Sequence, residues 1–206
     1  AEFDLIRRYF MSSQEASTAS NGVTLGCGDD ATLLMPQAGQ QLAVSVDTSV
    51  VNVHFPREAP AFAVGHRALA VALSDLAAMG AKSRWCLMAL TFDQREFVDD
   101  EATHLWLADY ARGFHTLCQQ HATTLVGGDV TSGALSIDLA HPLLRRYLLP
   151  EPRLAAGLAL RGLATAAMDI SDGLMADLTH LREASQVGAV IDVAALPLAE
   201  ELESTL

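Results

Sequence analysis

The stretch Pro60-Ala-Phe-Ala-Val-Gly-His-Arg-Ala-Leu-Ala-Val-Ala-Leu-Ser-Asp-Leu-Ala-Ala-Met-Gly80 decides the fold of this 206-residue chain. It places apolar side chains in every helical turn, and Gly80 is a typical helix stop, so residues 60–79 are predicted to form a largely buried helix. Asp75 lies among the apolar residues of this helix. A buried, ionised carboxylate without a partner carries a large desolvation cost. We therefore expect a metal or another charged partner at Asp75.

Strand and helix patterns alternate on both sides of this helix. Residues 42–47 are an apolar, β-branched run and residues 85–92 are an apolar run, and both are predicted strands. Residues 99–121 repeat apolar side chains along one helical face, which predicts a helix. Shorter elements are predicted as a helical turn at 5–11, strands at 123–126 and 166–170, and helices at 153–163 and 174–184. This alternation predicts the α/β (α+β) fold class.

The composition and charge of the chain indicate which kinds of binding partner it disfavours. The chain is 50% hydrophobic and 18% charged, as expected for a compact globular protein. Its formal net charge is -12, so nucleic acid and anionic membrane surfaces would be repelled over most of the surface. No uninterrupted apolar run is long enough to span a bilayer, and we expect no membrane partner. An anionic ligand would require bound cations.

The cysteines and histidines indicate neither a disulfide framework nor a zinc site. Cys27, Cys86 and Cys118 are odd in number and form no CxxC pair, which favours a reducing, cytoplasmic location. The histidines in the predicted helices lack the spacing of metal ligands. We expect them to be hydrogen-bonded or solvated helix residues.

Aspartates recur where predicted strands or glycine loops end. Carboxylates gathered from several loops suit magnesium, which prefers oxygen ligands and keeps phosphate oxygens among them. The aspartates in such positions are Asp29, Asp30, Asp47, Asp129, Asp169 and Asp172. Each alone equally fits a turn or cap, as Asp172 does before the last predicted helix. Taken together, they predict an α/β enzyme with an acidic, multi-metal phosphate site.

Two common nucleotide-binding motifs and one hydrolase motif are absent from the sequence. The loops Gly26-Cys-Gly28 and Gly127-Gly128 are followed by no Gly-Lys-Ser/Thr and lack the third glycine of the dinucleotide fingerprint. Ser171 lies in no nucleophile elbow and has no nearby histidine, so it is interpreted as a phosphate-binding or capping hydroxyl. A P-loop kinase and a serine hydrolase are both disfavoured.

Several motifs, in their order along the chain, resemble those of the thiamine-monophosphate kinase family. They span nearly the whole chain, and their combination is specific although each is modest alone. They are Glu2-Phe-Asp-Leu-Ile6, Leu25-Gly-Cys-Gly-Asp-Asp-Ala31, Val44-Ser-Val-Asp-Thr48, Val53-His-Phe55, residues 68–80, Leu125-Val-Gly-Gly-Asp-Val-Thr131, Pro150-Glu-Pro-Arg153 and Met168-Asp-Ile-Ser-Asp-Gly-Leu174.

The resemblance implies a two-domain fold like that of aminoimidazole-ribonucleotide synthetase, working as a homodimer with ATP near the subunit interface. Residues 1–138 would form the N-terminal domain, which binds ATP and magnesium and dimerises. Residues 139–206 would form part of the C-terminal α/β domain. The implied activity is ATP-dependent phosphorylation of thiamine monophosphate to thiamine diphosphate.

The resemblance also assigns roles to individual residues. Asp75 and Asp129 are expected to be catalytic, and His54 is expected to contact thiamine monophosphate. The implied ATP contacts are Gly128, Asp129 and Ser171. The implied ligands of several magnesium ions are Asp30, Ser45, Asp47, Asp75, Asp129, Asp169 and Asp172.

This chemistry predicts direct in-line transfer without a phospho-enzyme. The second pKa of a phosphate monoester is about 6, so the attacking oxygen is mostly ionised at neutral pH and needs no strong base. The main barrier is repulsion between two polyanions in an acidic site. Several magnesium ions, held by the aspartates, are the expected remedy.

The chain also departs from the family pattern. By this resemblance, family segments that carry an ATP-binding arginine and a late aromatic residue are expected to be missing near residues 138/139 and after residue 206. Val46 stands where many relatives have threonine, which leaves one hydroxyl ligand open. The alternatives are another ATP-using member of the superfamily, of the selenophosphate or aminoimidazole-ribonucleotide synthetase type, and a catalytically silent nucleotide- or metal-binding fragment.

Overall fold

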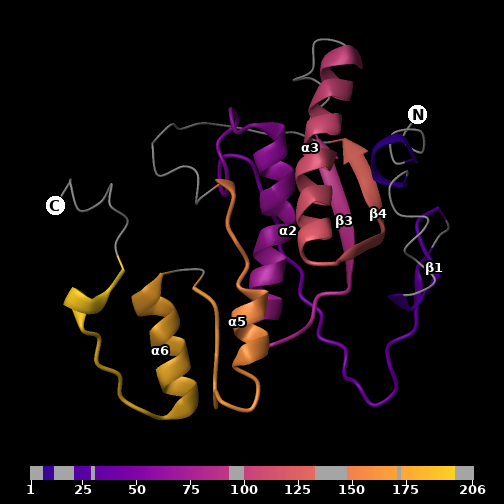
Figure 1. Cartoon of the computed structure of the whole chain (residues 1–206). Helices are drawn as coiled ribbons and strands as arrows, with labels where there is room; N and C mark the ends of the chain where they lie inside the picture. Colours follow the sequence, from indigo (N-terminus) through magenta and orange to yellow (C-terminus); the bar gives the residue numbers. More distant parts are fainter. Residues whose placement is uncertain are drawn as a thin grey trace.

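The computed structural model describes residues 7–11, 21–28, 31–92, 100–132, 148–170 and 173–197. Helices and strands alternate within it, as Figure 1 shows, so the predicted mixed α/β class is confirmed. The elements in chain order are η1 (Arg7–Met11), β1 (Val23–Leu25), β2 (Leu33–Leu34), α2 (Ala61–Ala78), β3 (Trp85–Phe92), α3 (Asp100–Gln120), β4 (Thr124–Ser132), α5 (Leu154–Ala159), α6 (Leu174–Ser185) and η4 (Val193–Ala195).

The core lies where α2 and α3 pack against each other and against the sheet of β3 and β4 (Figure 1). Leu73 of α2 and Leu107 and Leu117 of α3 are each only 1% exposed. Burying leucines of this kind contributes about 1.5–3 kcal/mol apiece. The apolar periodicity that predicted both helices therefore corresponds to their buried faces.

The two long helices approach each other at paired glycines. A side-chain β-carbon at Gly65 would lie 2.0 Å from the carbonyl oxygen of Tyr110, and one at Gly113 would lie 1.9 Å from that of Phe62. Both distances are far below van der Waals contact, so the backbones touch directly at this crossing. This contact fixes the position of α2, which carries Asp75.

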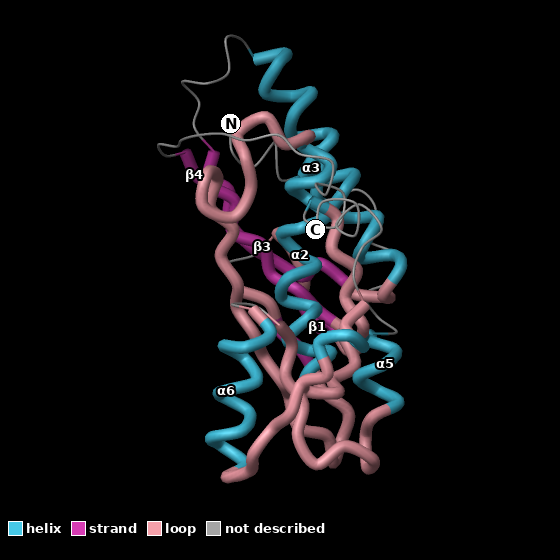
Figure 2. The backbone as a smooth tube through the Cα atoms, turned by 90° about the vertical axis from the view of Figure 1, so that its left-hand side faces the viewer, coloured by secondary structure: helices cyan, strands magenta, loops and turns pink. Residues whose placement is uncertain are grey.

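Two small sheets make up the β-structure of the described residues. Strands β3 and β4 are parallel, in a register that runs from Trp85↔Thr124 to Phe92↔Ser132. Strands β1 and β2 are antiparallel and form a hairpin, whose connection carries the Gly-Cys-Gly-Asp-Asp motif. Figure 2 shows β3 beside α2, with α5 and α6 toward the end of the molecule opposite the start of α3.

Most long elements agree with the sequence-based predictions. The helices predicted at 60–79, 99–121 and 174–184 and the strand at 85–92 are confirmed. The strand predicted at 123–126 is present but continues through the Gly-Gly-Asp motif to Ser132, so this motif lies within a strand and not in a loop after it. Parallel pairing with β3 accounts for the extension, since Gly128 and Asp129 pair with Met88 and Ala89.

Three predicted elements differ from the structure. Residues 42–47 and 166–170 are not strands, because neither segment has a hydrogen-bonded partner strand among the described residues. The helix predicted at 153–163 is shorter and covers only Leu154–Ala159. It ends where residues 160–164 turn away and are no longer buried.

Within the described residues, α2 is the one helix whose length and composition would allow it to cross a membrane. Forty-four per cent of it is buried inside the protein. It contacts α3 along its length and α5 near its C-terminal end. These contacts are those of a core helix. The cysteines Cys27, Cys86 and Cys118 are free thiols.

Candidate active site

Asp75 lies in the last turn of α2 and is half-buried. The hydroxyl of Ser45 donates a hydrogen bond to the Oδ2 atom of Asp75. This bond joins the chain segment that carries Ser45 to α2. The backbone carbonyl of Asp75 accepts the cap hydrogen bond from Met79 N at 2.9 Å. Ser45 gives Asp75 a neutral hydroxyl partner, whereas the metal or charged partner predicted from the sequence is not shown among the described residues and stays a prediction.

Asp47 belongs to the same acidic cluster. Partial burial raises its pKa above the ordinary value of 3.8, and the neighbouring carboxylates of Asp75 and Asp169 raise it further. The ring of His54 acts in the opposite direction on the pKa. Two other chain segments therefore bring Asp75 and Asp169 close enough to Asp47 to disfavour its ionised form, and a bound cation would relieve that repulsion.

His54 is held by a compact turn at residues 50–55. Its Nδ1 atom accepts a hydrogen bond from Val50 N at 3.0 Å, and its own backbone N–H donates to the Val50 carbonyl at 2.8 Å. The turn is closed by a 2.6 Å hydrogen bond from Asn52 N to the carbonyl of Phe55. Because Nδ1 acts as an acceptor, the neutral ring carries its proton on Nε2. His54 can thus donate a hydrogen bond through Nε2.

Gly128 and Asp129 lie next to each other on β4. Gly128 has a φ of 150°, and a β-carbon there would be 1.8 Å from the Met88 carbonyl oxygen, so only glycine fits. Asp129 is exposed, and its Oδ1 accepts a 2.9 Å hydrogen bond from Val130 N. This bond orients the carboxylate while leaving its second oxygen available to a ligand.

The structure brings some of the predicted site residues together. One group is linked by the hydrogen bond from Ser45 to Asp75 and by the electrostatic effects of neighbouring residues on Asp47. Its members are Ser45, Asp47, His54, Asp75 and Asp169. Asp30, Ser171 and Asp172 lie outside the described residues. Within the described ranges, no three histidine, cysteine, aspartate or glutamate side chains are close enough to hold one metal ion. The metal assignments accordingly stay predictions.

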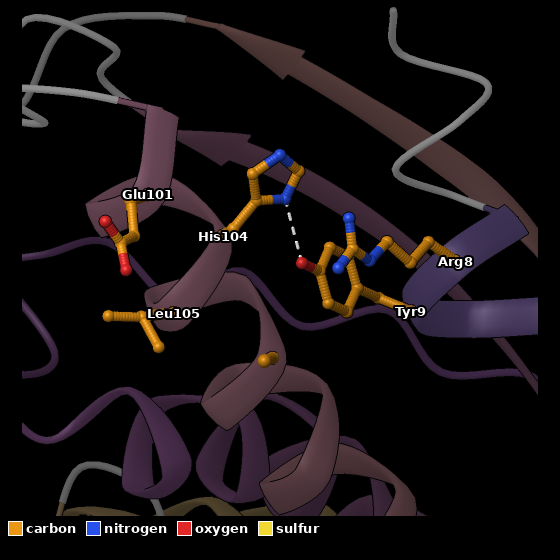
Figure 3. Close-up of a pocket in the computed structure, with 6 residues that line it drawn as sticks. Arg8, Tyr9, Glu101, His104 and Leu105 are labelled. Atoms are coloured by element: carbon orange, nitrogen blue, oxygen red, sulfur yellow. Dashed lines mark hydrogen bonds between the residues drawn. The ribbon is translucent and has the colours of Figure 1, made fainter.

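A separate hollow of about 480 Å³ lies between η1 and the first turns of α3. Figure 3 shows Tyr9 and His104 facing each other across it, with the Tyr9 hydroxyl hydrogen-bonded to His104 Nδ1 at 2.8 Å. Arg8 and Glu101 also line it. None of the predicted site residues contributes to this hollow, so it is distinct from the acidic cluster.

One structural contact near the site was not predicted from the sequence. Thr32 donates its hydroxyl to the Val126 carbonyl, directly before Gly127 and Gly128. Its only sequence signal is its position two residues after Asp30. The position of the acceptor, the Val126 carbonyl, depends on the pairing register of β4. Sequence patterns alone therefore could not identify its contact with Thr32.

Replacement of Asp47 by asparagine tests the repulsion within the cluster. The raised pKa means that folded protein holds this proton to a higher pH than the unfolded chain does, so wild-type stability falls as pH rises above about 3.8. The Asp47→Asn substitution removes this decrease in stability with rising pH. Without divalent metal at pH 7, its Tm should be about 2 °C above wild type, a small effect because the side chain is exposed. Thermal denaturation at pH 4 and pH 7 measures this.

The metal dependence of the same variant supplies the control. Added Mg²⁺ should raise the Tm of wild-type protein more than that of Asp47→Asn, because the variant has lost a charged ligand. A lower Tm for the metal-free variant at pH 7 would show that Asp47 is stabilised, and not repelled, by its neighbours.

Comparison with protein-family models shows the class of protein to which this chain belongs. The N-terminal domain model of AIR synthase related proteins matches residues 28–142, and the corresponding C-terminal domain model matches residues 118–206. The chain is thus an AIR synthase related protein.

Comparison with individual relatives shows the family within this class. The chain is 34% identical to the thiamine-monophosphate kinase of Haemophilus influenzae and 35% identical to that of Escherichia coli K12, over 98% of this chain and 73% and 74% of the relatives. The crystal structure of the Stenotrophomonas maltophilia thiamine-monophosphate kinase matches 98% of this chain and 77% of its own, with a TM-score of 0.77 at 34% identity. The chain belongs to the thiamine-monophosphate kinase family.

Two further facts come from these comparisons. AaThiL, solved in complex with AMPPCP and TMP, shares the fold at 24% identity and a TM-score of 0.65, over 75% of this chain and 63% of its own. The alignments with the bacterial kinases run over 251 positions although this chain has 206 residues. The relatives therefore have residues inside the aligned region that this chain lacks, while the domain boundary at 138/139 stays a prediction.

Proposed function

We propose that this chain transfers the terminal phosphate of ATP to thiamine monophosphate, giving thiamine diphosphate and ADP. The observation that carries the proposal is the group of Asp47, Asp75 and Asp169 beside His54, in a member of the thiamine-monophosphate kinase family. Clustered carboxylates next to a hydrogen-bond donor suit the binding of cations together with a phosphate monoester.

The proposed reaction is a direct displacement at phosphorus. A phosphate oxygen of thiamine monophosphate forms a bond to the γ-phosphorus of ATP, the bond from that phosphorus to the β,γ-bridging oxygen breaks, and ADP leaves with the electron pair. The attacking phosphate is mostly ionised at neutral pH because its second pKa is about 6. No side chain has to remove a proton, so the protein acts by positioning and charge.

The donor set of the cluster fits Mg²⁺, because all its candidate ligands are hard oxygen atoms. Unit charges about 4 Å apart interact by about 4 kcal/mol at an effective dielectric of 20, and bound Mg²⁺ would offset such repulsion between the two substrates. The residues proposed to hold several ions are Asp30, Ser45, Asp47, Asp75, Asp129, Asp169 and Asp172.

The ATP contacts are proposed at Gly128, Asp129 and Ser171. The absence of a side chain at Gly128 allows a phosphate to approach the backbone closely. Asp129 is exposed beside it, with one carboxylate oxygen engaged by Val130 N. These features support a phosphate-binding role for this part of β4.

A homodimer in the cytoplasm is proposed as the working state. Leu42, Val44 and Val46 are 56%, 76% and 88% exposed and alternate along a segment that pairs with no strand in the described part of the chain. A second copy could pair with this segment and bury its side chains. The three free thiols favour a reducing compartment.

The role of His54 can be tested with two isosteres that separate its ring nitrogens. Asparagine places a polar atom near the Nδ1 position, where it can accept from Val50 N, whereas glutamine reaches the Nε2 position. If His54 donates through Nε2 to thiamine monophosphate, His54→Asn should raise KM for that substrate about tenfold and His54→Gln by less. KM for ATP should stay within twofold in both variants.

Steady-state kinetics with each substrate varied in turn measure these changes. Equal KM values for thiamine monophosphate in wild type and His54→Asn would remove His54 from the substrate site. A larger defect in His54→Gln than in His54→Asn would assign the role to the Nδ1 contact and the turn instead.

The proposed activity itself is tested by two measurements on the same protein. Calorimetry with ATP and Mg²⁺ measures nucleotide binding, and a coupled assay with thiamine monophosphate measures turnover. The proposal requires both binding and formation of thiamine diphosphate. Binding without turnover would favour a catalytically silent fragment, and turnover only with another acceptor would favour a different synthetase of the superfamily.

A further inference from the structure

A β-bulge lies in β4 directly before the Gly-Gly-Asp motif. Cys86 pairs with Leu125, but the next residue of β3, Leu87, pairs with Gly127, so Val126 has no partner across the sheet. Bulges are rare between parallel strands, and they change the direction of the side chains that follow. The residues that follow here are Gly128 and Asp129.

Thr32 contacts the bulge from the neighbouring hairpin. Its hydroxyl donates a hydrogen bond to the carbonyl of Val126, a residue that is only 1% exposed. A buried carbonyl left without a donor would cost about 1–3 kcal/mol, so this bond stabilises the bulge. A β-carbon on Gly127 would lie 2.9 Å from Thr32 Oγ1, which shows how closely the hydroxyl is seated against the strand.

Asn21 anchors the other end of the same hairpin to the sheet. Its Nδ2 donates to Thr124 Oγ1 at 2.8 Å and to the Arg84 carbonyl at 3.2 Å. Its Oδ1 accepts from Arg84 Nη2 at 3.1 Å, and its backbone carbonyl accepts from Trp85 Nε1 at 3.0 Å. The hairpin is therefore fixed to the start of β3 and β4 independently of Thr32.

We propose that Thr32 is a positioning residue for the phosphate-binding part of the site. By satisfying the carbonyl at the bulge, its hydroxyl sets the direction in which β4 presents Gly128 and Asp129. This inference rests on the proposed function, because it takes these two residues to contact ATP and its cation. Thr32 acts through the strand and touches neither substrate.

Two substitutions at this position separate the hydroxyl from the shape of the side chain. Thr32→Val keeps the branched shape and removes the donor, whereas Thr32→Ser keeps the donor. The matched control is Thr116→Val, because Thr116 Oγ1 also donates to a backbone carbonyl, that of Arg112 at 2.7 Å, on the exposed side of α3.

The measurements are KM for ATP, the half-saturating Mg²⁺ concentration, Tm and calorimetric affinity for Mg·ATP. Thr32→Val should raise KM and the Mg²⁺ requirement about fivefold to tenfold, the effect of losing one hydrogen bond at a buried group. Thr32→Ser should stay within twofold of wild type. Thr116→Val should change neither quantity. A structural role alone would lower Tm in Thr32→Val and leave both quantities unchanged.

Unchanged nucleotide and Mg²⁺ dependence in Thr32→Val, or an equal defect in Thr32→Ser, would overturn the proposal. If Thr32→Val does not fold, Thr32→Cys, which fills the space with a weaker donor, replaces it and should show an intermediate shift. Wild-type protein that binds Mg·ATP but makes no thiamine diphosphate would refute the proposed function alone, because the affinity comparison still decides the role of Thr32. Wild-type protein that binds no Mg·ATP would refute both.

Discussion

Asp75→Asn is expected to reduce turnover about 100-fold to 1000-fold at fixed Mg²⁺, the size of effect seen when one group that stabilises transition-state charge is removed. Asparagine keeps the shape of the side chain and can still accept a hydrogen bond from the Ser45 hydroxyl. The lost negative charge weakens cation binding between the substrates. Initial rates with thiamine monophosphate, together with Tm, measure the effect.

Asp129→Asn should show a loss of similar size, because its exposed carboxylate is proposed as a ligand on the ATP side. Asp109→Asn is the control, since Asp109 lies on the exposed face of α3 and pairs with Arg112 on the surface. All three variants should retain a Tm within a few degrees of wild type. Near-normal rates in both Asp75→Asn and Asp129→Asn would contradict the assignment.

The largest effect on stability is expected at the crossing of α2 and α3. Gly65→Ala and Gly113→Ala would each place a β-carbon about 2 Å from a backbone carbonyl oxygen on the other helix. The helices must then move apart, which should destabilise the protein by about 3 kcal/mol, at the upper end for overpacking. The corresponding decrease in Tm is roughly 6–12 °C for a chain of this length.

Gly188→Ala is the matched control for this prediction. No atom lies within 4 Å of the β-carbon that it would add, so it should change Tm by less than about 2 °C. Chemical denaturation of the three variants provides the free energies of unfolding. Wild-type stability in both Gly65→Ala and Gly113→Ala would mean that the two helices do not meet at these glycines.

The sequence predicted α2, α3 and β3 well because their signals are local. Apolar side chains repeat every three to four residues in the two helices, and β3 is a short, continuous apolar run bounded by polar residues. The segment 42–47 carries the same kind of signal as β3. It is not a strand here because a strand also needs a partner, and pairing depends on residues far away in the sequence.

The candidate site shows the same division between local and long-range information. The position of Asp75 on an apolar helix predicted a metal or charged partner, whereas the partner in the structure is the neutral hydroxyl of Ser45, which no local pattern indicated. The approach of Asp169 to Asp47 joins residues more than one hundred positions apart, and the sequence indicated it only through the recurrence of aspartates at the ends of predicted elements and through the family resemblance. The contact of Thr32 with the bulge depends on a single register shift in β4, which no composition or periodicity encodes.

The central claim is that the acidic side chains bind divalent cations between the phosphates of ATP and thiamine monophosphate. The most direct measurement is the anomalous scattering of Mn²⁺, in place of Mg²⁺, in crystals grown with a non-hydrolysable ATP analogue and thiamine monophosphate. We expect peaks within coordination distance of Asp47, Asp75 and Asp129, each also contacting a phosphate oxygen. Bound ligands with no anomalous peak at these carboxylates, or carboxylates that point to separate regions, would contradict it.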